Sequence, residues 1–269
     1  MCQNREFYFF IIIIQNLFLY LINRICYKNM NTITDILQFL QKPNFESFQD
    51  VSGSKVKKFF TIFLWLFLIV IGANILVMML QTVIVSKPIM SNPINRLIYL
   101  ASEWKTWNIF HVILLSPILE EFSYRYALSS FNITRIKISL SLILSFHISY
   151  LLYFYKFHQL CEVNLVLHVL SLYGTIFFVA TVLFLIMSLF NKQLTMFENK
   201  WNTHPMVIFY LSAVLFTIYH VYNMPVLFFL SIFAGAVIFG YTRIRLGFGY
   251  VIVLHVLWNI VSSFRLLMS

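Results

Sequence analysis

The sequence predicts an all-α protein: a polytopic transmembrane helix bundle with seven core spans, and an eighth at the amino terminus if residues 7–23 also insert. Composition is the first observation, because 61% of the 269 residues are hydrophobic and only 10% are charged, whereas a soluble domain carries about 25% charged residues. The mean hydropathy of +0.84 is the second. Third, long apolar runs recur between short polar connections, and a transmembrane helix needs about 20 such residues.

The amino-terminal part of the chain divides at Met30. Residues 7–23 form an apolar run that is either a membrane anchor or an uncleaved signal, because no small-residue cleavage pattern follows it. Since Met30 offers a second start, residues 1–29 are either this anchor or a mis-assigned extension of the reading frame. Residues 30–58 are predicted to be a polar cytoplasmic tail, and residues 59–269 to be the membrane-embedded domain.

The membrane-embedded domain is predicted to contain seven apolar spans. Residues 59–85 carry no charge and are long enough to cross a bilayer with some tilt. The two shortest spans are separated by a tight connection at Pro225. After the first span, the others cover residues 109–130, 138–155, 165–190, 206–222, 225–242 and 246–266.

Basic residues are predicted to set the orientation of the spans. They gather in four connections that alternate along the chain, so that all four lie on the cytoplasmic side under the positive-inside rule. The residues are Lys55, Lys57, Lys58, Arg135, Lys137, Lys192, Lys200, Arg243 and Arg245. The net charge of +10 is therefore assigned to topology and to anionic lipid, with no nucleic-acid partner. A multi-pass protein of the plasma membrane is predicted.

Glu120 and Glu121 are the two acidic residues, of nine, that lie inside a long apolar run. A charge at the centre of a bilayer costs about 2.5–3.5 kcal/mol, so ionisable residues there indicate a functional site. Glu121 and Arg125 are four residues apart and can pair on one helix face, while Glu120 is rotated by about 100°. One carboxylate can thus be neutralised while its neighbour acts as a general base. The alternative is an ion pair that only locks helices together.

Two further pairs of residues, each spaced by four, lie in later spans. Phe216 and His220 come near the end of one span, where a lone histidine is more often a polar cap or an interface residue. His255 and Asn259 share one helix face, and their N–H groups together suit a developing oxyanion. The alternative for this second pair is hydrogen bonding between helices.

In this order the motifs resemble those of the CPBP family, also called the CAAX-protease and bacteriocin-processing or Abi family. The chain matches the three family motifs with Glu120-Glu121-Phe-Ser-Tyr-Arg125, Phe216-x-x-x-His220 and His255-x-x-x-Asn259. The resemblance, which includes Pro117 upstream of the acidic pair, covers roughly residues 109–263. Tyr126 departs from it, because relatives often carry glycine there, and we expect this tyrosine to narrow the pocket or to alter substrate fit.

The resemblance implies a glutamate-dependent intramembrane endopeptidase that requires no metal and no other cofactor. It implies that Glu120 activates a water molecule that His220 holds or polarises. It also implies an oxyanion hole of His255 and Asn259, and an orienting, charge-balancing pair of Glu121 and Arg125. The expected partners are the lipid bilayer and a peptide or membrane-protein substrate, with or without a lipid. A prenylated carboxy-terminal tetrapeptide, a bacteriocin leader and an unrelated membrane peptide all remain open as substrates.

Two other functions remain open at this point. A non-catalytic self-immunity or scaffold member of the family would keep the motifs for structure, and a proton relay or transporter also buries Glu, His and Arg. The sequence lacks the motifs of other kinds of intramembrane protease: it has no H-E-x-x-H, no aspartate after Asp50 and no G-x-S-G. Cys2, Cys26 and Cys161 have no paired spacing, so neither a disulfide framework nor a thiolate metal site is predicted.

Overall fold

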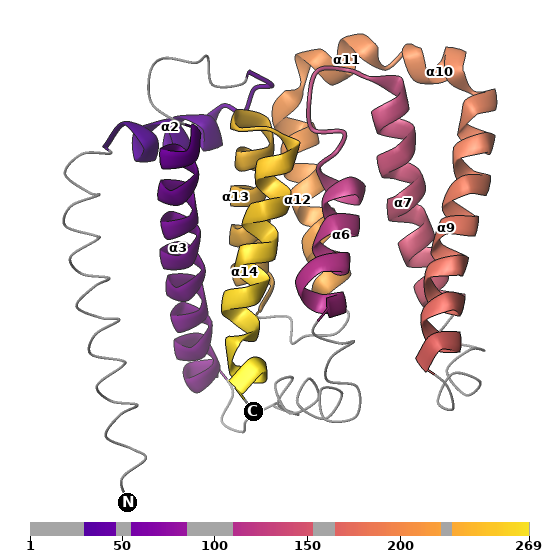
Figure 1. Ribbon diagram of the computed structural model, residues 1–269. Helices are drawn as coiled ribbons and strands as arrows, with labels where there is room; N and C mark the ends of the chain where they lie inside the picture. The colour runs from indigo at the N-terminus through magenta and orange to yellow at the C-terminus, as the bar shows by residue number, and fades with distance from the viewer. Residues whose placement is uncertain (1–29, 47–54, 85–109, 153–164, 222–227, 269) are drawn as a thin grey trace, which may run out of the picture.

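A computed structural model describes residues 30–46, 55–84, 110–152, 165–221 and 228–268 of the protein (Figure 1). Over these ranges the regular elements are helices and there is no strand, which confirms the all-α prediction. They are α2 (Met30–Gln41), α3 (Lys55–Ile84), the π-helix η1 (His111–Leu115), α6 (Ser116–Tyr124), α7 (Ile133–Leu152), α9 (Leu165–Leu189), α10 (Asn191–Thr195), α11 (Glu198–Thr203), α12 (Pro205–Val221), α13 (Phe229–Arg245) and α14 (Phe248–Met268). The run 7–23, the connection at Pro225 and the three cysteines lie outside the described residues.

Each of the seven predicted spans contains a described helix, but the number of membrane crossings stays a prediction. By length and composition, the stretches Lys55–Val77 and Ser171–Leu189 can each cross a membrane. A third crossing is added if Asn191–Thr203 and Pro205–His220, which meet at an angle of 103°, are counted as one broken span. The stretch Phe248–Ser263 is apolar but shorter.

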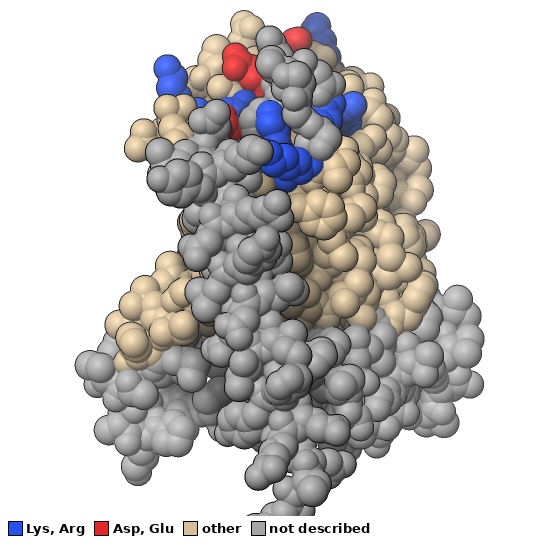
Figure 2. Space-filling view, turned by 60° about the vertical axis from the view of Figure 1, so that its left-hand side comes forward, with Lys and Arg blue, Asp and Glu red and all other residues tan. Residues whose placement is uncertain are grey.

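The four basic connections lie at one end of the bundle. The upper end of Figure 1 holds all four of them: the starts of α3 and α7, the pair α10 and α11, and the turn from α13 to α14. Lys and Arg side chains gather at that end on the face seen in Figure 2, above a surface of uncharged residues. This arrangement agrees with the orientation predicted from the positive-inside rule.

The span predicted over 109–130 is built of more than one element. A π-helical turn, η1, comes first, and α6 then ends at Tyr124. The change from π to α geometry coincides with Pro117, which has no N–H and cannot donate to the turn before it. The run therefore provides a short helix that carries both glutamates, and an irregular stretch follows it.

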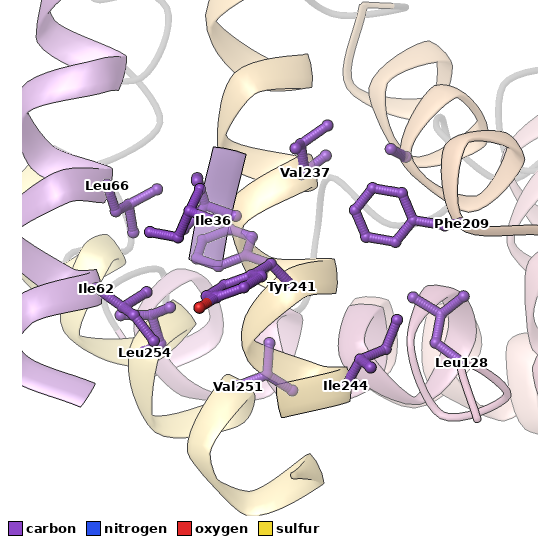
Figure 3. Packing of buried hydrophobic residues seen from close by; sticks show 14 of the residues in the cluster. Ile36, Ile62, Leu66, Leu128, Phe209, Val237, Tyr241, Ile244, Val251 and Leu254 are labelled. Carbon is purple, nitrogen blue, oxygen red and sulfur yellow. The ribbon is translucent and has the colours of Figure 1, made fainter. Parts of the chain in front are cut away.

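Part of the predicted amino-terminal tail is a helix that packs on the bundle. Apolar residues of α2 recur at helical spacing, and Ile36 and Phe39 are buried in the core. The hydroxyl of Tyr241 on α13 donates to Oδ2 of Asp35 over 2.5 Å, which joins α2 to the basic end of the bundle. Figure 3 shows Ile36 close to Tyr241, with Leu66 of α3 on its other side.

The hydrophobic core lies where α2, α3, α6, α12, α13 and α14 meet (Figure 3). Within it, α12 packs closely against α13 at Gly240. A Cβ atom built on Gly240 would lie 2.7 Å from Cε2 of Phe209, so only glycine allows this ring to pack there. By contrast, α9 packs mainly on α7 and leaves large apolar side chains such as Phe178 and Leu185 exposed, as suits contact with lipid.

Candidate active site

Helix α6 is surrounded by η1, α7, α12 and α14, and donors from three helices hold its carboxyl end. The last carbonyl groups of a helix have no partner within it, and inside a membrane each must find a donor. Ser139 of α7 donates to Phe122 O at 3.0 Å, Ser212 of α12 donates to Tyr124 O, and Arg243 of α13 donates to Arg125 O and Tyr126 O at 3.0 and 3.2 Å. These bonds fix the position of the helix that carries Glu120 and Glu121.

Glu121 is fully buried, and one of its oxygen atoms accepts hydrogen bonds from two donors. Its Oε1 lies 3.0 Å from Nη1 of Arg125 and 2.8 Å from Nδ1 of His255. The guanidinium of Arg125 also stacks on the ring of Phe216, with 3.8 Å between Cζ and the ring centroid. The pairing of Glu121 with Arg125 expected from their spacing is therefore present, and Phe216 of the second motif covers the cation.

Glu120 faces both motif histidines. Its Oε2 lies 3.5 Å from Nε2 of His220 and 3.7 Å from Nε2 of His255, while its Oε1 accepts a hydrogen bond from the Ser116 hydroxyl. Both distances to nitrogen are too long for direct hydrogen bonds. The three groups converge on one point although they come from α6, α12 and α14.

The other ring nitrogens of the two histidines determine what Nε2 presents to Glu120. Nδ1 of His220 lies 2.9 Å from the carbonyl oxygen of Phe216, which can only accept, so this Nδ1 carries a proton. Nδ1 of His255 likewise faces a carboxylate oxygen of Glu121. A singly protonated ring therefore directs its Nε2 lone pair at Glu120, and a doubly protonated ring directs an N–H there.

Asn259 is placed differently from the other motif residues. Its Nδ2 donates to the carbonyl oxygen of Val112 in η1 over 2.8 Å. The structure brings Glu120, Glu121, His220 and His255 into direct proximity, whereas one amide proton of Asn259 is committed to the main chain before α6. The prediction that Asn259 and His255 act as a pair of oxyanion donors stays a prediction.

Sequence reasoning missed the residues that position this cluster. Ser116 lies four residues before Glu120, and that spacing was the available signal. Arg243 was assigned to topology, yet it is 8% exposed and binds main-chain carbonyls.

Tyr126 packs its ring against Phe122 and Phe248, with centroids 5.2 and 5.0 Å apart. Whether it alters substrate fit stays a prediction.

Within the described residues, no group of three or more His, Cys, Asp or Glu side chains is arranged to hold a metal ion. The cluster is instead two carboxylates, two imidazoles and a guanidinium, linked through Glu121 and His255. Such a set can take a proton from a bound molecule at Glu120 and return it.

Comparison with known proteins identifies the family. The family model described as "Type II CAAX prenyl endopeptidase Rce1-like" matches residues 102–261. No curated protein matches the chain, and no solved structure matches it. The matched range is more than half of the chain, contains all three motifs and confirms the resemblance inferred from them. The chain therefore belongs to the Rce1-like family of type II CAAX prenyl endopeptidases, a family of membrane-embedded proteases.

Proposed function

We propose that the protein is an intramembrane peptidase in which Glu120 is the general base that activates water. The observation that carries this proposal is the convergence of two Nε2 atoms, 3.5 and 3.7 Å away, on Oε2 of Glu120. A water molecule among these groups finds acceptors for both of its protons, with its own lone pair free to attack. The buried surroundings of Glu120, which is 6% exposed, strengthen each of these interactions.

The proposed reaction uses the two sides of Glu120 for different tasks. Oε1 is held by Ser116, and Oε2 takes a proton from water while His220 orients that water through Nε2. The water oxygen then bonds to the carbonyl carbon of the scissile peptide. Glu120 returns the proton to the peptide nitrogen, and the carbon–nitrogen bond breaks, so no metal is needed as a Lewis acid or as a proton carrier.

His255 is the proposed donor to the oxyanion that forms on the peptide carbonyl. In this role both of its ring nitrogens carry protons, with Nδ1–H held on Glu121 and Nε2–H free for the oxyanion. The second N–H of Asn259, beside the one donated to Val112, is the further donor assigned from the sequence. Glu121 and Arg125 balance the charge and hold the ring of His255 in place.

The proposed substrate is a peptide with a prenylated carboxy-terminal CAAX-type sequence, presented from the plasma membrane. The family match supports this substrate class, and the apolar surface of the helices, such as that of α9, suits a substrate that arrives through lipid. Prenylated and unprenylated forms of one peptide, compared in the same vesicles, test the contribution of the lipid. Equal kcat/KM for the two forms would contradict this assignment.

The decisive experiment substitutes the proposed base in the purified protein in proteoliposomes. Glu120→Gln should abolish cleavage while the protein stays folded and inserted, and Glu198→Gln, at an exposed position on α11, is the matched control that should keep full activity. Full activity of Glu120→Gln would rule out the base. Dissipation of a pH gradient without any peptide product would favour a proton relay. A wild-type protein that cleaves none of the peptides tested would favour a non-catalytic role.

A further inference from the structure

At the junction of η1 with α6, a proline stands where the hydrogen-bond register calls for a main-chain N–H. The N–H of Ser116 bonds to the carbonyl oxygen of His111, five residues earlier. In the same register the next carbonyl, that of Val112, requires an N–H from Pro117, and proline has none. Inside a membrane helix an unpaired carbonyl is costly, so it needs a donor from elsewhere.

Asn259 of α14 supplies that donor. Its Nδ2 lies 2.8 Å from the carbonyl oxygen of Val112, although the two residues are 147 positions apart. A carboxamide N–H is chemically close to the main-chain N–H that proline lacks. The side chain thus takes the place of the absent proton at the point where the helix changes from π to α geometry.

The same junction controls the position of Glu120. Ser116 is the first residue of α6. Its N–H bonds back to the carbonyl of His111, and its hydroxyl donates to Oε1 of Glu120. A shift of the junction therefore moves the hydroxyl and the carboxylate together, away from the fixed Nε2 atoms of α12 and α14. A displacement of about 1 Å in an active site is enough to reduce a rate about 100-fold.

We propose that Asn259 is a positioning residue whose bond to Val112 replaces the proton that Pro117 lacks and so aims Glu120 at its two histidines. This inference rests on the proposed role of Glu120 as the base. It is separate from any bond that the second N–H of Asn259 makes to an oxyanion. The two contributions differ in one respect, because only the positioning contribution depends on Pro117.

A double-mutant cycle with Pro117 separates them. Asn259→Ala should lower kcat by about 10- to 100-fold with little change in KM, because the base is misplaced while the substrate surface is kept. Pro117→Ala restores a main-chain N–H, and alone it should leave activity near that of the wild type. Asn259→Ala should therefore lower kcat less in the Pro117→Ala background than in the wild type, because only the loss due to positioning is recovered. An equal loss from Asn259→Ala in both backgrounds would overturn the proposal and leave the oxyanion contribution alone.

Hydrogen exchange supplies a measurement that does not require activity. In the full-length protein in lipid nanodiscs, Asn259→Ala should speed exchange in the segment 110–121, and adding Pro117→Ala should slow it again. Ser262→Ala, one turn further along α14, is the matched control and should change neither exchange nor kcat. Unchanged exchange in Asn259→Ala would refute the positioning role even if Pro117→Ala were itself inactive.

The two proposals fail in different ways. Full activity of Glu120→Gln would refute the assignment of Glu120 as the base. The hydrogen-exchange experiment would still decide whether Asn259 holds the junction. If Glu120→Gln is inactive and the effects of Asn259→Ala and Pro117→Ala on kcat are additive, the role of Glu120 as base is supported and the positioning role of Asn259 is refuted.

Discussion

Nδ1 of His255 lies 2.8 Å from Oε1 of Glu121, although 134 positions separate the two residues. The same oxygen also accepts Nη1 of Arg125 at 3.0 Å. One buried carboxylate oxygen thus joins α14 to α6 and neutralises a buried cation. This relationship separates the tasks of the neighbouring acids, because Glu121 holds Arg125 and His255, while Oε2 of Glu120 faces two imidazoles at 3.5 and 3.7 Å.

Glu121→Gln should destabilise the fold much more than Glu120→Gln. Removing one partner of a buried ion pair costs about 3–5 kcal/mol, because the other charge stays buried and uncompensated, and Arg125 is fully buried here. Oε2 of Glu120 lies farther from its imidazole neighbours, at 3.5 and 3.7 Å, so the amide variant should unfold near the wild-type temperature. Thermal unfolding of both variants in the same detergent measures the difference. Equal melting temperatures would contradict the division of tasks.

Ser116→Ala should lower kcat about 10-fold with KM nearly unchanged. The hydroxyl donates to Oε1 of Glu120, and a hydrogen bond to a charged group contributes about 1.5–3 kcal/mol. Ser116→Thr keeps the donor and should restore most of the rate. Ser123→Ala is the matched control, because Ser123 also lies in α6 but donates to the carbonyl of Leu119 at 2.7 Å. Steady-state cleavage of one peptide by the four proteins tests this, and a threonine variant as slow as the alanine variant would refute it.

Gly240→Ala should destabilise the contact between α12 and α13. The added methyl group would lie 2.7 Å from the buried ring of Phe209, and forcing an extra carbon into a packed core costs about 1–3 kcal/mol. Phe209→Leu should relieve the clash in the double variant. Gly72→Ala is the control, because nothing lies within 4 Å of its added Cβ. Unfolding temperatures in detergent are the measurement, and a wild-type value for Gly240→Ala would contradict the packing described.

A strong chelator should leave cleavage intact. In the proposed reaction the proton transfers use Glu120 and the oxyanion is held by N–H groups, so no step depends on a divalent ion. Activity is measured before and after incubation with the chelator and after dialysis. Loss of activity that Zn²⁺ restores would identify a metallopeptidase and overturn the metal-independent mechanism.

Local relationships in this chain could be predicted from sequence because helical spacing determines them. Glu121 and Arg125 form the expected ion pair, since residues four apart are neighbours on any α-helical turn. The apolar runs likewise located a described helix in each predicted span, because backbone groups in lipid must pair within their own segment. The π-helical turn before Pro117 was not predicted, because a proline in an apolar run also occurs at a simple kink.

Relationships between distant segments required the structure. Arg243 was grouped with the loop lysines from its charge alone, yet its guanidinium is buried and holds the carbonyls after α6. The expectation of a polar tail also missed α2, because the apolar spacing around Ile36 and Phe39 is short and needs the surface of α12 and α13 to cover it. In both cases the partner that decides the outcome lies far away in sequence.

By itself, the amino-acid sequence determined the helical class, the basic end of the bundle, the family and the four side chains expected to do chemistry. Only the tertiary structure decided that Glu120 meets two Nε2 atoms, that Glu121 is shared by Arg125 and His255, and that Asn259 reaches Val112. The physical reason is that hydropathy and helical spacing act along one segment. The approach of separate helices depends on how their side chains pack, and on where a proline leaves a carbonyl in need of a donor.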